Sequence, residues 1–186
     1  MFEILVPKTE MFNESSNEFV ESKETVLRLE HSLVSISKWE SKWKKPFFGN
    51  SKKDRKTIPE FKDYIRCMTL NQNVDPSVYR ALTGDMIRSI SEYVASDLSA
   101  TWFTDKHPQS QRPGQRETVT SELVYYWMVT FNIPFECQKW HFSRLMALIR
   151  ICAIKNNPGK KMSKHEIISR NRDLNNQRKK ALHTKG

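Results

Sequence analysis

Residues 120–152, TSELVYYWMVTFNIPFECQKWHFSRLMALIRIC, decide the fold. Apolar residues recur at helical spacing over 123–131 and again over 135–152. Between the two runs, Pro134 follows a short turn and stands at the first turn of the second helix, where its missing N–H removes no hydrogen bond. The segment therefore predicts a largely buried helix and a second helix that opens at Pro134, packed as an αα-hairpin at the centre of the core.

Upstream of this hairpin, the chain carries four signals for the start of a helix. Each signal is a residue whose side chain can accept a backbone N–H as an N-cap, followed by a segment with a helical pattern. The four residues are Ser32, Thr57, Asp75 and Thr83. Residues 104–116 contain two prolines, a glycine and no aliphatic side chain, which predicts a flexible loop within the helical core.

The first 31 residues have the alternating pattern of strands. Phe2, Ile4 and Val6 stand at every second position, as on one face of a strand. Further along, Phe12 and Phe19 flank a polar turn. A third alternating segment covers residues 24–31. We therefore expect an α+β, mainly α, protein. Its predicted parts are an antiparallel β-meander over 1–31, a helical core over 32–156 and a basic, conditionally ordered helix or tail over 157–186.

Charge is distributed unevenly over the 186 residues. The formal net charge is +10, of which the first 30 residues contribute −4 and the last 32 contribute +8. A basic tail of this kind binds an acidic partner or stays solvated. The acidic front and the basic end also allow copies of the chain to associate head to tail.

Composition excludes several classes of protein. The five glycines lie at least 27 residues apart, so neither glycine-rich phosphate-binding loop is present. Three cysteines without a C-x-x-C pair do not make a disulfide scaffold, which favours a reducing, cytoplasmic setting. The apolar start has no basic segment before it, which makes a poor signal peptide, and the longest apolar stretch is far short of the ~20 residues of a membrane span.

No cluster of residues predicts catalysis, a metal or a cofactor. His165 and Glu166 begin the H-E-x-x-H pattern, but Ser169 replaces the second histidine. Cys137 and His141 share a face of the predicted helix, yet a zinc site needs three or four ligands, so packing is the favoured interpretation. We expect a non-enzymatic protein with no cofactor.

Two basic segments are candidates for binding. Trp39 and Trp43 lie among lysines, which suits base stacking, but their spacing favours an amphipathic helix with tryptophans in the core. In the tail, three apolar residues share one face and favour a protein partner: Ile167, Leu174 and Leu182. The basic residues that accompany them are Lys160, Lys161, Lys164, Arg170, Arg172, Arg178, Lys179 and Lys180. A nucleic-acid arm and a solvated tail remain open alternatives.

Several stretches of the sequence resemble the tail assembly chaperones of long-tailed, siphovirus-type bacteriophages: residues 27–47, 63–69, 120–152 and 170–186. The resemblance implies a protein that binds the tape measure protein and keeps it soluble until tail-tube subunits polymerise. It also implies a place in the host cell cytoplasm, absence from the mature virion and, in many phages, a longer frameshifted form. It transfers no catalytic or binding residue. The alternative is a basic nucleic-acid-binding protein that uses the C-terminal tail.

Overall fold

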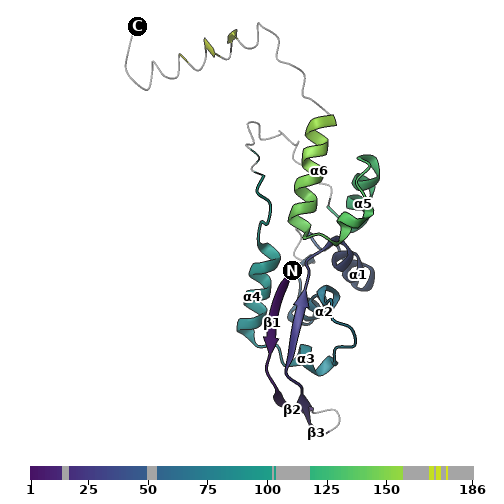
Figure 1. The fold of residues 1–186 in the computed structure, drawn as a ribbon, viewed down its shortest axis with the longest axis vertical. Coiled ribbons are helices and arrows are strands. Elements are labelled where there is room, and N and C mark those ends of the chain that lie inside the picture. The colour runs from purple at the N-terminus through teal and green to yellow at the C-terminus, as the bar shows by residue number, and fades with distance from the viewer. Residues whose placement is uncertain are drawn as a thin grey trace. The chain divides into compact units, whose positions relative to one another are not determined.

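The computed structural model describes residues 1–13, 17–49, 54–101, 103, 118–156, 168–169, 171–172 and 175. The chain divides into two units, Met1–Arg150 and Ile151–Gly186. The structure confirms the predicted fold class, because a small set of antiparallel N-terminal strands precedes a series of helices (Figure 1). The predicted loop over 104–116 lies outside the described residues.

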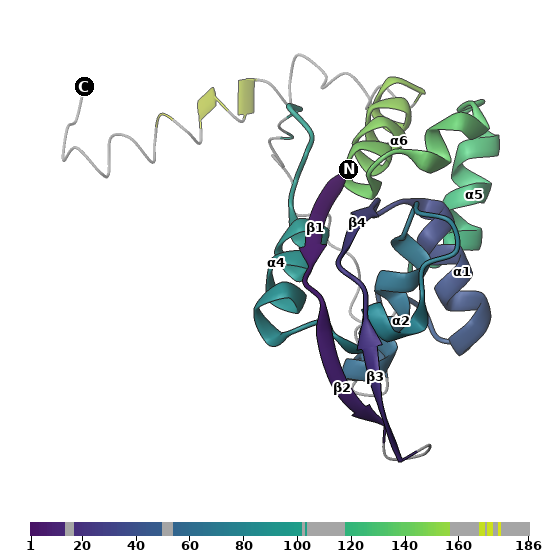
Figure 2. The same ribbon diagram turned by 60° about the horizontal axis from the view of Figure 1, so that its bottom comes forward.

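Four strands make up the N-terminal part: β1 (Phe2–Val6), β2 (Thr9–Asn13), β3 (Glu18–Ser22) and β4 (Thr25–Leu29). They pair as β1 with β4 and β2 with β3, both antiparallel. The two pairs lie end to end as the two halves of one long hairpin (Figure 2). The predicted meander is therefore wrong in its connectivity. Direct pairing of β1 with β4 sets Phe2 opposite Leu29 and Ile4 opposite Leu27, so that apolar cross-strand pairs form on one face.

Residues 70 and 71 lie along the outer edge of β4 and form hydrogen bonds with it. The N–H of Leu70 donates to the Arg28 carbonyl at 2.8 Å. The Asn71 side chain accepts from the Arg28 N–H at 2.7 Å and donates to the Val26 carbonyl at 3.1 Å. This edge of the strand pair is thus not left open for pairing with another chain.

Four helices follow the strands: α1 (Leu33–Trp43), α2 (Ile58–Met68), α3 (Pro76–Arg80) and α4 (Gly84–Ala95). All four begin after the predicted N-cap residues, whose side chains accept backbone N–H bonds. Before α2, the Thr57 hydroxyl accepts from the Glu60 N–H, and the Glu60 carboxylate accepts from the Thr57 N–H. α1 packs on α2, and α4 lies against β1 (Figure 2).

The C-terminal helices differ from the predicted hairpin. They are α5 (Ser121–Thr130), the 3-10 helix η2 (Phe135–Lys139) and α6 (Phe142–Asn156). The helix expected to open at Pro134 is interrupted at residues 140–141, because the Phe142 N–H donates to the His31 carbonyl at 2.7 Å and His141 bridges to Ser32. α5 packs chiefly on α1 and is exposed along one face, so the prediction of a largely buried helix was also wrong.

The core lies where β4, α1 and α2 meet. Its largest fully buried side chains are apolar or aromatic: Leu27, Leu29, Leu33, Ile36, Trp39, Tyr64, Ile65 and Met68. Val124 and Met128 of α5 and Leu145 of α6 are also buried. Throughout the part of the chain that the structure describes, no helix combines the length and apolar character needed to cross a bilayer.

Candidate functional site

The predicted tail site falls almost entirely outside the described residues. Of its members, Arg172 alone is described, and it is helical and exposed. The others lie in the part of the chain that the structure does not describe: Ile167, Leu174, Leu182, Lys160, Lys161, Lys164, Arg170, Arg178, Lys179 and Lys180. Close to Arg172, Ile168 is helical as well and presents a large apolar side chain that is 66% exposed.

The tryptophans of α1 are structural. The Trp39 ring is fully buried, and its Nε1 donates to the Glu60 carbonyl at 2.9 Å. Trp43 is half-buried, and its Nε1 donates to the Asp63 carboxylate at 2.9 Å. A nucleic-acid surface built on both rings is therefore excluded, because a buried indole has no face to offer a base.

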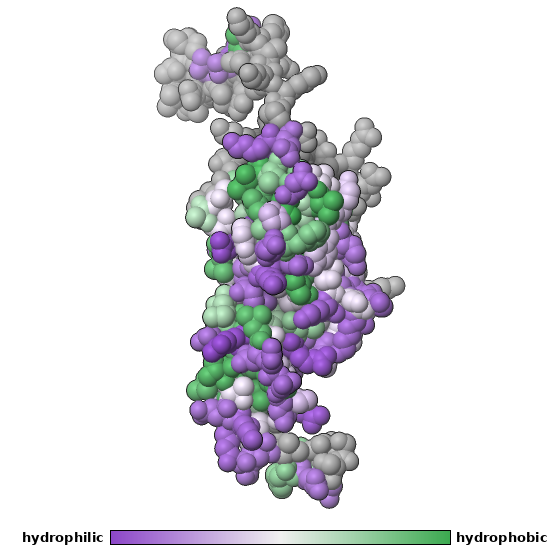
Figure 3. All heavy atoms as spheres, turned by 45° about the vertical axis from the view of Figure 1, so that its right-hand side comes forward, coloured by the Kyte–Doolittle hydropathy of each residue, from purple (hydrophilic) through white to green (hydrophobic). Residues whose placement is uncertain are grey.

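Exposed apolar side chains lie on α5 and η2. The exposed fractions are 63% for Tyr126, 61% for Val129 and 54% for Phe135. Tyr126 and Val129 are three residues apart and share a face of α5, and the Phe135 ring lies 6.5 Å from that of Tyr125. On the side of the molecule that carries α5, apolar residues interrupt the hydrophilic surface (Figure 3). We call Tyr126 and Val129 the α5 apolar surface.

A second surface feature is a groove of about 420 Å³ between α1, α2 and α3. Its cationic side chains are Lys42, Lys62, Arg66 and Arg80. The apolar part of its lining comes from Pro59, Pro76 and the Tyr79 ring. We call this feature the basic groove. Sequence reasoning missed it, because the contributing residues come from three helices; the one available signal was that residues 59, 62, 63 and 66 share a face of α2.

Asp63 organises the charges of the basic groove. Its Oδ1 lies 2.7 Å from the Lys42 ammonium and 3.1 Å from the Arg66 guanidinium, and its Oδ2 accepts from Trp43. Burial would raise the pKa of Asp63, but the hydrogen bonds from Lys42 and Trp43 and the charge of Arg66 outweigh it and hold that pKa below its usual value. The carboxylate thus stays ionised and orients two of the four cations.

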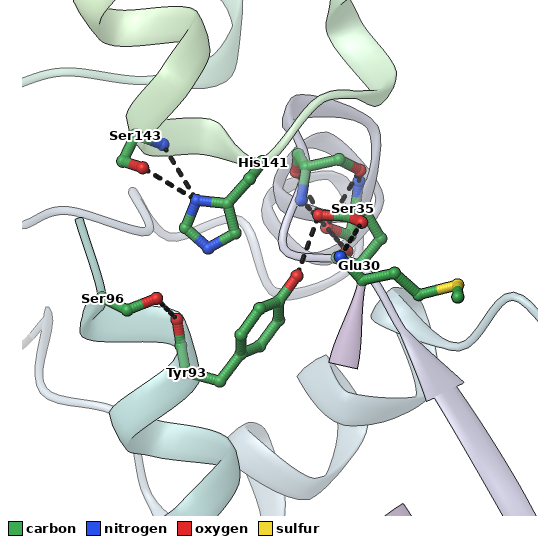
Figure 4. Close-up of polar contacts among 8 residues, drawn as sticks. Glu30, Ser35, Tyr93, Ser96, His141 and Ser143 are labelled. Atoms are coloured by element: carbon green, nitrogen blue, oxygen red, sulfur yellow. Dashed lines mark hydrogen bonds and ion pairs between the residues drawn. The ribbon is translucent and has the colours of Figure 1, made fainter. Parts of the chain in front are cut away.

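Partly buried polar side chains also meet between the end of β4 and the starts of α1 and α6 (Figure 4). The Tyr93 hydroxyl donates to the Glu30 carboxylate at 2.9 Å, and the amino terminus lies 2.8 Å from the other oxygen of Glu30. The Ser35 hydroxyl donates to the Glu30 carbonyl at 3.2 Å. These bonds fix the chain start, α1 and α4 to the end of β4.

Two buried histidines lie beside these contacts. His31 Nδ1 is 2.5 Å from the Tyr64 hydroxyl, and its ring centroid is 5.1 Å from that of His141. His141 Nδ1 accepts from the Ser143 N–H at 3.3 Å, whereas its buried Nε2 has no hydrogen-bond partner among the described residues. Burial, helped by His141 and Lys56, lowers the pKa of His31 to about 3, and burial lowers that of His141. Both rings are therefore neutral near pH 7, and both are closed to solvent.

The cysteines are free thiols. Cys137 is buried in η2, and Cys67 and Cys152 are half-buried. Cys137 and His141 do not share a helix face as predicted, because the chain leaves the helical conformation between η2 and α6. Within the described ranges, no three histidine, cysteine or carboxylate side chains converge as metal ligands would.

Comparison of the chain with protein-family models, curated proteins and solved structures gives no match in any of the three searches.

Proposed function

We propose that the chain is a bacteriophage tail assembly chaperone, which binds the tape measure protein and keeps it soluble in the host cytoplasm while the tail tube polymerises. In this role it acts without catalysis and leaves before the virion matures. The sequence resemblance over residues 27–47, 63–69, 120–152 and 170–186 suggests this function. Among the structural features, the α5 apolar surface is the observation that carries it.

Physical chemistry supports this use of the surface. A long helical partner exposes an apolar stripe along its length, and a binding protein that covers it needs apolar side chains exposed before binding. Tyr126 and Val129 meet this requirement without a loss of core packing, because other residues of α5, Val124 and Met128, anchor the helix. A tyrosine also contributes a large contact area at a small loss of side-chain entropy.

The C-terminal tail is proposed as the second contact. The sequence spacing of Ile167, Leu174 and Leu182 would put them on one face of a helix formed on the partner, as in coupled folding and binding. The experiment is coexpression of the tape measure protein with the full chain or with a chain lacking residues 160–186. We expect the full chain to keep the partner in the soluble fraction and the shortened chain to lose it. Equal solubility with both would remove the tail from the mechanism.

The alternative function is nucleic-acid binding through the basic C-terminal tail, which the net charge of +10 favours. A tagged pull-down from infected cells, washed at low and high salt, separates the two. Binding through phosphates weakens steeply with salt, whereas binding through apolar contacts persists. A long, helix-rich phage protein retained at high salt would support the chaperone. Nucleic acid released by salt, without such a protein, would support the alternative.

A further inference from the structure

We propose that the basic groove between α1, α2 and α3 is a docking site for an acidic segment of a protein partner. Carboxylates of that segment meet the four cations, and an apolar side chain enters between Pro59, Pro76 and Tyr79. This site is separate from the α5 apolar surface and from the tail, and it does not depend on the partner being a tape measure protein.

The size of the groove suits a short peptide. Its volume of about 420 Å³ lies within the ~300–1,000 Å³ that is usual for ligand sites. On α2, its lining runs from Pro59 to Arg66, a rise of roughly 10 Å along the helix axis. About three residues of an extended peptide cover that distance.

The charges are arranged before any ligand arrives. Asp63 holds the Lys42 ammonium and the Arg66 guanidinium, and Trp43 in turn holds Asp63. An ammonium has three N–H donors and a guanidinium has five, so both cations retain donors for another carboxylate. Preorganised cations lose less side-chain entropy on binding than free ones.

The remaining two cations add charge that Asp63 does not neutralise. Lys62 donates to the Arg80 carbonyl at 3.4 Å, which brings its ammonium to the end of α3. Arg80 is the last residue of α3 and is exposed. With four cations and one carboxylate, the groove has a net positive charge and complements an acidic ligand.

The apolar lining favours a peptide over a nucleic acid. Sites for single strands combine cations with several aromatic rings on which bases stack. In the described part of this groove, Tyr79 is the one aromatic lining residue, and it is half-buried with its hydroxyl bonded to Thr69 at 3.1 Å. Two prolines provide the rest of the apolar lining and suit an aliphatic or aromatic side chain.

The chain's own tail does not suit this site, since residues 155–186 carry +8 and would be repelled. The first 30 residues carry a net charge of −4, so the acidic N-terminal part of a second copy is the competing occupant. Measurement of self-association in wild type and in a groove variant distinguishes a second copy from a different protein partner.

The test uses the full chain and a fluorescent twelve-residue peptide in which glutamates alternate with leucines. Two counterparts replace every glutamate by glutamine or by lysine. The groove variant is Lys62→Glu with Arg80→Glu, which leaves the contacts of Asp63 intact. The matched control is Arg88→Glu with Lys139→Glu, which changes the net charge by the same amount at exposed sites outside the groove. Circular dichroism confirms that both variants are folded.

We expect the groove variant to bind the acidic peptide at least tenfold more weakly than wild type, and the control to stay within about threefold. The groove variant should also prefer the lysine peptide, and wild type should bind the glutamine peptide weakly. Equal losses in both variants would overturn the proposal in favour of diffuse electrostatics. A twelve-nucleotide oligothymidine that binds the groove more tightly than the acidic peptide would overturn it in favour of nucleic acid. Self-association abolished by the groove variant, without peptide binding, would assign the groove to a second copy.

Discussion

Glu40 of α1 accepts a hydrogen bond from the backbone N–H of Ser121, the first residue of α5, at 2.7 Å from Oε2. Its other carboxylate oxygen accepts from the Phe47 N–H at 2.6 Å. The carboxylate is buried, and it satisfies an N–H that has no partner within its own helix. One side chain thus joins α1, the loop that follows it and the start of α5, and the negative charge lies at the favourable end of the α5 dipole.

Replacing Glu40 by glutamine tests this connection. One carboxylate oxygen becomes an NH₂ group, which cannot accept, so one buried N–H loses its partner. We expect the free energy of unfolding to fall by about 1–3 kcal/mol, measured by urea denaturation. The control is Glu92→Gln on the exposed side of α4, which should change it by less than about 0.5 kcal/mol. Equal changes in both variants would contradict a structural role for Glu40.

The buried His31 makes stability depend on pH. Its pKa is about 3 in the folded chain, against an ordinary value of about 6.5 in the unfolded one. Between these values the unfolded chain binds the extra proton, so the free energy of unfolding should decrease as pH falls from 6.5 toward 3. His31 contributes in total roughly 4–5 kcal/mol to this decrease, which is complete below pH 3.

Comparison with His31→Gln isolates this contribution. The variant loses the contact with Tyr64 and is less stable at pH 7, but its free energy of unfolding should fall less steeply between pH 6 and pH 4. The expected difference in slope is at most about 1.4 kcal/mol per pH unit, the value for one proton. Carboxylates titrate in both proteins and cancel in the difference. Equal slopes in wild type and variant would show that His31 binds its proton as readily in the folded chain as in the unfolded one, which contradicts a lowered pKa.

Local signals in the sequence were sufficient to predict the starts of α1, α2, α3 and α4. The capping of α2 needs only Thr57 and Glu60, which are three residues apart, and its geometry is as expected. The break before α6 was beyond such reasoning, because it depends on the His31 carbonyl, which is more than 100 positions away in the chain. The pattern that predicted a buried α5 counted apolar residues, whereas the structure buries Val124 and Met128 and exposes Tyr126.

The candidate sites also depend on contacts between residues distant in sequence, which local signals do not predict. The basic groove combines Lys42 with residues of α2 and α3, and only packing of the helices brings these charges together. Trp39 and Trp43 had the predicted amphipathic arrangement, but the carboxylate that holds Trp43 lies on the next helix. The predicted tail contacts stay predictions, since most of those residues lie outside the described part of the chain.

Asp63→Asn should change stability and binding in opposite directions. The pKa of Asp63 is lowered in the folded chain, so its ionised form contributes to stability above the ordinary carboxyl pKa. We expect a loss of about 0.5–1 kcal/mol in the free energy of unfolding at pH 7. Removal of the one carboxylate in the groove lining should at the same time strengthen binding of the acidic peptide about threefold. Weaker peptide binding in a folded Asp63→Asn protein would show that the orientation of Lys42 and Arg66 matters more than net charge.

The α5 apolar surface allows the proposed chaperone function to be tested without disturbing the fold. In Tyr126→Ser with Val129→Ser, both changes lie at side chains more than 60% exposed, so the free energy of unfolding should change by less than about 1 kcal/mol. Binding should suffer more, because each side chain loses apolar area that the partner would cover. We expect most of the coexpressed tape measure protein to move from the soluble fraction to the pellet. The control is Ile58→Ser, at an apolar side chain 70% exposed at the start of α2, which should leave the partner soluble. If Ile58→Ser lowered partner solubility as much as the double variant, solubilisation would depend on general surface hydrophobicity and not on α5.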